Sequence, residues 1–218
     1  MKGPGDAPPA APSSTTDQVN QANIPAIDPA PPLKQLVPHL FQTCDTAIIS
    51  QLVTEMISRL ISHNDRIPLT SATVTRFHSR APPGIKLDDY LRRIVKFASV
   101  EPSVVILLLV YIDRICEINP TFTISSLTVH RFIIAAVTAG SKALSDIYCT
   151  NTYYARVGGI SLQELNLMEM EFCKMIGWKL SCSIILLQQY YANLVRTSPL
   201  YVLAPPPQQQ LQIQQAQQ

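Results

Sequence analysis

The sequence contains little charge and no apolar run of membrane-spanning length. Charged residues make up 15% of it, against about 25% in typical soluble domains, so we expect part of the surface to meet a partner. The net charge of +2 argues against nucleic acid, because nucleic-acid-binding domains carry a pronounced basic surface. The most apolar stretch is "VVILLLVYI" (residues 104–112), whereas a spanning helix needs about 20 residues. We therefore expect neither nucleic acid nor a membrane as a partner.

Paired-cysteine motifs and a secretory signal are also absent. The five cysteines are an odd number and form no CxxC, which argues against a disulfide framework or a zinc site and favours a reducing compartment. The first residues, "MKGPGDAPPAAPSS", contain no apolar run and do not resemble a signal peptide. We expect a protein of the nucleus, the cytoplasm or both.

Motifs of catalysis are missing as well. The sequence has no GxSxG, no phosphate-cradling glycine loop and no HExxH, and none of its four histidines form an i,i+4 pair. We therefore expect no enzymatic activity and no cofactor or metal.

Most of the eighteen prolines lie at the two ends, and this distribution divides the chain into three parts. Residues 1–38 are rich in proline and alanine, and residues 199–218 join a proline block to a glutamine tract. Both compositions are typical of disorder, because they offer too little apolar surface to bury. The pattern predicts one folded domain at residues 39–198 between a disordered leader and a disordered tail.

The predicted domain is all-α. Apolar residues recur at helical spacing, and proline, glycine and capping residues separate the segments. Phe97 is predicted on the buried face of the second helix. Ser161 and Glu164 form a capping box at the start of the fifth helix. Short connections indicate that consecutive helices pack as neighbours. We expect five helices in a bundle, preceded by an extra helix. The six segments are residues 46–65, 87–100, 102–118, 126–145, 162–178 and 183–196.

Two charges stand among residues that are otherwise apolar. Lys142 lies in "AAVTAGSKALSD", a row of small residues that lets another helix approach closely. Glu169 falls on the apolar stripe of the next long helix, where an unpaired carboxylate would cost several kcal/mol. Two interpretations stay open. The charges form an internal salt bridge or extend to solvent, or they mark the edge of a face that binds the backbone of a partner.

Four segments resemble a cyclin box in order and spacing. They are "YIDRI" (111–115), "HRFIIAAVTAGSKALSD" (130–146), "NTYYARVGGIS" (151–161) and "ELNLMEMEFCKMIGWKL" (164–180). The segment "FHSRAPPGIKLDDYLRRIVKFA" (77–98) also resembles the entry to this box in the phosphate-regulation cyclins of yeast and the P/U-type cyclins of plants and protozoa.

The resemblance implies a single five-helix cyclin box and a function without chemistry. The protein would be a regulatory subunit that binds and activates a cyclin-dependent serine/threonine protein kinase, in cell-cycle or in nutrient and phosphate control. The alternative is a helical scaffold of the same fold that binds no kinase.

The resemblance also assigns candidate kinase-binding residues. Lys142 and Glu169 match the family's lysine and glutamate that contact the kinase. Four apolar residues, which fit the core equally well, complete the candidate list: Phe132, Leu144, Tyr153 and Trp178.

One family pairing is missing from the sequence. Asp113 matches an aspartate that usually pairs with an arginine of the first box helix, but this stretch is "PPGIKL" here. Arg92, Arg93 or Arg131 remain as possible partners for Asp113.

Overall fold

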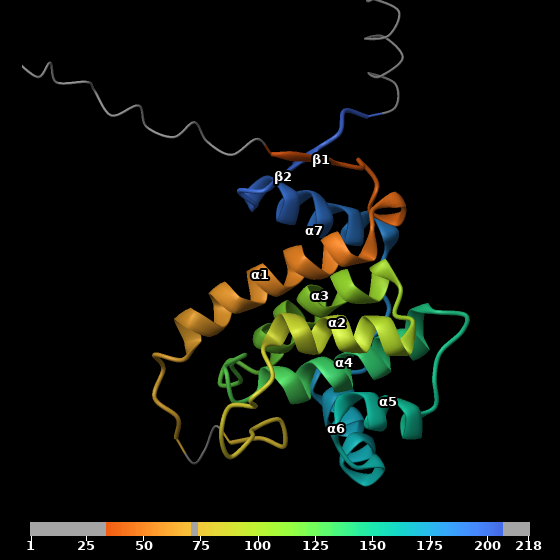
Figure 1. Cartoon of the computed structure of the whole chain (residues 1–218). Helices are drawn as coiled ribbons and strands as arrows, with labels where there is room; N and C mark the ends of the chain where they lie inside the picture. The colour runs from red at the N-terminus through yellow and green to blue at the C-terminus, as the bar shows by residue number, and fades with distance from the viewer. Residues whose placement is uncertain (1–33, 71–73, 207–218) are drawn as a thin grey trace, which may run out of the picture. The chain divides into compact units, whose positions relative to one another are not determined.

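The computed structural model describes residues 34–70 and 74–206, and seven α-helices account for most of them (Figure 1). This confirms the all-α prediction. Most of the predicted leader and tail lies outside the described residues. The helices are α1 Thr46–Asn64, α2 Leu87–Ala98, α3 Pro102–Ile118, α4 Val129–Leu144, α5 Asn151–Gly158, α6 Leu162–Met175 and α7 Ile184–Thr197.

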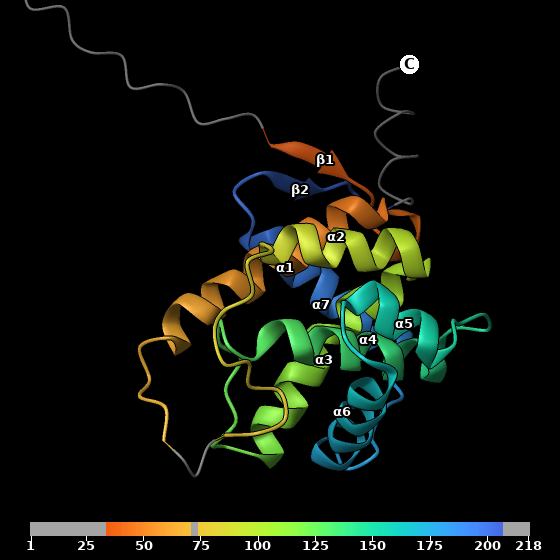
Figure 2. The ribbon, with the colours of Figure 1, turned by 60° about the horizontal axis from the view of Figure 1, so that its bottom comes forward.

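Helix α3 is the centre of the bundle. Every residue from Val104 to Ile112 is buried, and the helix contacts α1, α4 and α7. Proline at its first position suits the helix start, where no backbone N–H is needed. The apolar run therefore forms a core helix that packs against α1, α4 and α7 (Figures 1 and 2).

The small residues of α4 let this helix approach α3 closely. A methyl group added at Gly140 would lie 3.2 Å from Leu107 Cδ2 and 3.3 Å from Val104 Cγ1. Near the start of α4, Phe132 packs edge-on against Phe77 and Phe172, with ring centroids 6.1 and 5.7 Å apart. Close backbone approach and aromatic packing thus fix the position of α4.

Helix α5 was missing from the sequence prediction, which placed six helices in the chain. It has only eight residues, too few for a clear apolar period. The Thr150 side chain accepts a hydrogen bond from Tyr153 N at its start. Gly159, with φ +73°, ends it in the left-handed region that favours glycine. The helix therefore ends at the two consecutive glycines, residues 158–159.

Two short strands correct the predicted leader and tail. Strand β1 (Gln35–Val37) pairs in parallel with β2 (Tyr201–Leu203) (Figure 2). Val37 and Tyr201 are buried, and the Tyr201 hydroxyl donates to Gln51 Oε1 of α1 over 2.8 Å. Residues 34–38 and 199–206 thus belong to the ordered part, because strand pairing between segments so far apart leaves no trace in local composition.

Candidate partner-binding face

Lys142 and Glu169 form an ion pair between α4 and α6. The Nζ–Oε1 distance is 2.7 Å, and the side chains remain 32% and 17% exposed. Lys142 lies in the last turn of α4, where a cation suits the helix dipole. The internal salt bridge is therefore present, and because both groups still reach the surface, it is compatible with the partner-binding interpretation.

The second oxygen of Glu169 has its own partner. Asn151 Nδ2, at the start of α5, lies 2.8 Å from Glu169 Oε2. The same nitrogen donates to Asn166 Oδ1 over 2.7 Å. Both carboxylate oxygens are thus bonded, yet each retains a free lone pair, and Lys142 retains two N–H donors.

Cys173 and Tyr154, which lie near the Lys142–Glu169 pair, are neutral at physiological pH. Burial raises the pKa of the Cys173 thiol, and the Glu169 carboxylate raises it further, although Lys142 opposes this. Burial likewise raises the pKa of Tyr154. The charge of this cluster therefore comes from Lys142 and Glu169 themselves.

The apolar candidates divide into core and surface. Phe132 has no exposed surface, so it belongs to the core and offers a partner no atom. Leu144 is half-buried and packs against the core. Tyr153 is partly exposed, and its hydroxyl donates to Phe97 O over 2.9 Å. Trp178 is 62% exposed.

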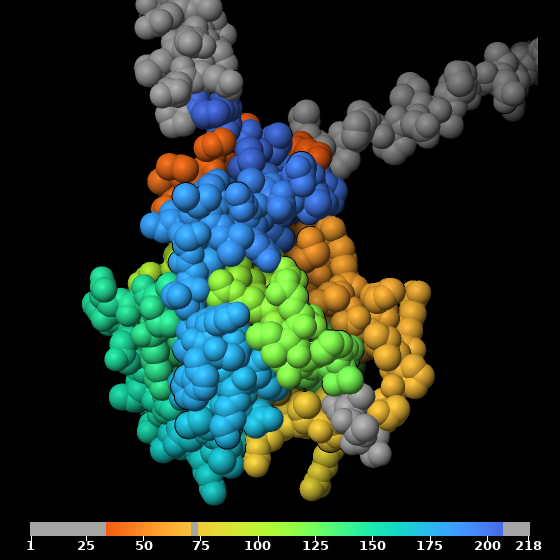
Figure 3. Space-filling model, turned by 180° about the vertical axis from the view of Figure 1, so that it is seen from behind, coloured from red at the N-terminus to blue at the C-terminus, as the bar shows by residue number. Residues whose placement is uncertain are grey.

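The loop between α6 and α7 holds Trp178 outward. Trp178 has φ +59°, directly after Gly177 at φ +61°. Tyr111 and Arg114 of α3 donate to carbonyl oxygens of residues 179–181 over 2.7 to 2.9 Å. From behind, this connection, light blue, runs beside the green α3 (Figure 3). The core helix thus fixes the loop while leaving the indole in solvent.

Exposed apolar side chains also lie outside the predicted candidates, among them Ile147, Tyr148 and Phe97. Ile147 and Tyr148 lie in the loop between α4 and α5, which runs out from the bundle in Figure 1. Phe97 was predicted to be buried but is exposed, because Leu91, Ile94 and Ala98 form the buried face of α2 instead. The sequence did carry a signal for this exposed surface, because two large apolar side chains stand in the connecting segment "SDIYC" (residues 145–149).

Comparison with known proteins decides the family. The family model described as "Cyclin" matches residues 10–180, which is most of the chain. The chain belongs to the cyclin family. Its helical fold agrees with a cyclin box.

Curated relatives place this cyclin near the P/U-type. The "Nuc-1 negative regulatory protein preg" of Neurospora crassa is 38% identical over 88% of this chain and 41% of its own length. The "PHO85 cyclin PHO80" of Saccharomyces cerevisiae is 36% identical over 67% of this chain and 52% of its own length. "Cyclin-U4-1" of Arabidopsis thaliana is 34% identical over 71% of this chain and 79% of its own. This cyclin spans about half or less of the first two relatives, and the predicted P/U-type resemblance is confirmed.

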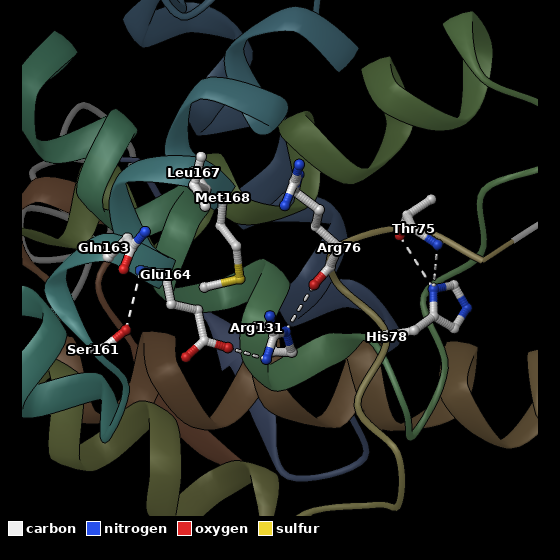
Figure 4. Close-up of a pocket in the computed structure, with 9 residues that line it drawn as sticks. All are labelled: Thr75, Arg76, His78, Arg131, Ser161, Gln163, Glu164, Leu167 and Met168. Atoms are coloured by element: carbon white, nitrogen blue, oxygen red, sulfur yellow. Dashed lines mark hydrogen bonds and ion pairs between the residues drawn. The ribbon is translucent and has the colours of Figure 1, made fainter.

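A second group of charges lines a pocket of about 380 Å³ (Figure 4). Arg131 of α4 forms an ion pair with Glu164 of α6, and its Nε donates to Arg76 O over 2.8 Å. Ser161 Oγ accepts from Glu164 N over 3.1 Å, which confirms the predicted cap. The Glu164 side chain, however, pairs with Arg131 instead of returning to the backbone of Ser161. This bridge joins α4, α6 and the segment before α2.

Asp113 has a partner outside the three predicted arginines. The Tyr190 hydroxyl of α7 donates to Asp113 Oδ2 over 2.5 Å. All three predicted arginine partners were wrong, because each arginine bonds elsewhere. Arg92 pairs with Asp88 and Asp89, Arg93 donates to Arg156 O, and Arg131 pairs with Glu164.

Residues 34–70 and 74–206 contain no group of three or more His, Cys, Asp or Glu side chains that could hold a metal ion. No helix in these ranges is long and apolar enough to cross a bilayer.

Proposed function

We propose that this cyclin is a regulatory subunit that binds and activates a cyclin-dependent serine/threonine protein kinase. The observation that carries the proposal is the Lys142–Glu169 pair, which joins α4 to α6 at 2.7 Å and stays partly exposed. Because both side chains reach the surface, the hydrogen-bonding capacity that the pair leaves unused is accessible to a partner.

The free hydrogen-bonding capacity fits a polypeptide backbone. Lys142 can donate to a carbonyl oxygen of the partner, and Glu169 can accept from an amide N–H, without breaking their own bond. Exposed Trp178, Tyr153 and Tyr148 add apolar and aromatic surface, of the kind enriched at binding interfaces. We propose that the partner contacts these aromatic side chains in addition to the charged pair.

The activity would lie in the partner. In protein kinases, a glutamate of a mobile helix must pair with the ATP-site lysine. A subunit that binds the active arrangement more tightly shifts the equilibrium toward it, and a shift from 1:99 to 99:1 needs about 10⁴-fold preference. The cyclin would supply this differential affinity and no catalytic group.

The names of two relatives support a regulatory context. One relative is named as a cyclin of PHO85 and another as a negative regulator of Nuc-1. We propose nutrient or phosphate control, or cell-cycle control, as the role of this chain, in the nucleus, the cytoplasm or both.

The test is association with purified cyclin-dependent kinases, followed by a kinase assay on the complex. Lys142→Glu should weaken association about 10- to 100-fold, because it leaves Glu169 facing a like charge and removes a donor from the face. The control Arg59→Glu reverses an exposed charge on α1 and should bind as the unaltered chain does. Equal binding by Lys142→Glu would reject this face. Failure of the unaltered chain to bind any kinase would favour the scaffold alternative.

A further inference from the structure

Asn151 holds the Glu169 carboxylate from the side opposite Lys142. Asn151 Nδ2 is 2.8 Å from Glu169 Oε2, whereas Lys142 Nζ is 2.7 Å from Oε1. We propose that Asn151 is a positioning residue, which fixes the carboxylate in the orientation that a kinase backbone requires. This inference rests on the proposed function and adds a residue of α5 to it.

The chemistry of the cluster determines which atom of Asn151 faces Glu169. An ionised carboxylate only accepts hydrogen bonds, so the side-chain amide must present its nitrogen. That nitrogen carries two hydrogens. One goes to Glu169 Oε2 and the other to Asn166 Oδ1, 2.7 Å away. Both donors of Asn151 are therefore used inside the chain, and its role toward a partner is indirect.

Asn151 is itself placed by the backbone of α5, of which it is the first residue. The helix is capped at its start by Thr150. At its end, the Gly158 carbonyl accepts from the Tyr90 hydroxyl over 3.2 Å. Anchoring at both ends leaves the asparagine little freedom, so it can serve as a fixed point for a longer side chain.

A glutamate held at one oxygen would lose this orientation. Without Asn151, the Lys142 bond alone would hold Glu169, and the carboxylate could turn about its terminal torsion. Ordering a flexible side chain on binding lowers affinity. Because Asn151 orders the carboxylate in the free chain, we expect its loss to weaken kinase binding about 3- to 10-fold.

Three single variants separate positioning from packing. Asn151→Ala removes the donor and should give this loss. Asn151→Asp keeps the shape of the side chain but places an acceptor against Glu169, so it should lose more kinase affinity than the alanine variant. Retained binding by Asn151→Asp would mean that only the shape matters, and it would overturn the inference. Asn166→Ala is the comparison variant, because it removes the other partner of Asn151 but leaves the bond between Asn151 and Glu169. It should weaken binding less than Asn151→Ala does.

A double-mutant cycle identifies the route of the effect. If Asn151 acts through Glu169, Asn151→Ala should have no further effect in a Glu169→Ala background. An equal loss in both backgrounds would overturn the inference, as would no loss in the unaltered background.

A measurement on the free chain keeps this result apart from the proposed function. The side-chain amide protons of Asn151 should exchange slowly with water by NMR, and faster in Glu169→Ala. Fast exchange in the unaltered chain would overturn the inference even if a kinase binds. Slow exchange in a chain that binds no kinase would instead reject the proposed function.

Discussion

Alanine at Gly158 tests how α5 is docked on α4. The new methyl carbon would lie 2.6 Å from Ile134 Cγ1 and 3.1 Å from Ile134 Cδ1, whereas carbon atoms pack best at about 3.5–4.0 Å. Alanine favours a helix by up to about 1 kcal/mol, less at a helix end, but overpacking costs about 1–3 kcal/mol. The clash outweighs the propensity gain, and we expect a net loss of about 1–2 kcal/mol in the free energy of unfolding.

Urea unfolding measures this loss, and two other glycines serve as controls. A methyl group at Gly84 meets nothing within 4 Å, so alanine there should be neutral or slightly stabilising. Gly159 also has space, but its φ of +73° should cost about 1–2 kcal/mol through the backbone alone. Ile134→Ala should cost less in the Gly158→Ala background than by itself, because it removes the clashing atoms. If Gly158→Ala is as stable as Gly84→Ala, the docking of α5 is wrong.

Two further predictions concern a buried imidazole nitrogen and an exposed hydrogen bond. Burial lowers the pKa of His130 below 6.5, and its buried Nδ1 has no partner among the described residues. The free energy of unfolding should therefore reach its maximum above pH 6.5. It should decrease as the pH drops from 6.5 through the lower pKa of the folded state. His130→Gln should flatten this decline in urea unfolding at pH 7.5 and 5, and an unchanged slope would contradict the assignment. Tyr190→Phe removes the hydrogen bond to Asp113 and should cost about 1 kcal/mol, while an unchanged denaturation midpoint would show that the bond adds nothing.

Local pattern was enough to predict the long helices. The apolar spacing of α1, the first-position proline of α3 and the cap at Ser161 act within a few residues of themselves, so the sequence displays them directly. Helix α5 was missed because its stability comes from packing on α4 and from Tyr90, neither of which is local. The pairing of β1 with β2 was invisible for the same reason.

The candidate site was predictable in its charges and less so in its surroundings. Lys142 and Glu169 stood out because charge on an apolar row is costly, and the structure joins them. Asn151 gave no such signal, since a neutral amide at a helix start is common. Phe132 and Trp178 were equivalent as apolar candidates, and only the packing separates a buried ring from an exposed one.

The most direct test of the central claim is kinase affinity of the charge-swapped chain, Lys142→Glu with Glu169→Lys. The swap keeps an ion pair between α4 and α6, so the fold should remain, as checked by urea unfolding. It reverses donor and acceptor on the exposed face, and we expect affinity to fall at least about tenfold. A folded, swapped chain that binds the kinase as tightly as the unaltered chain would contradict the account.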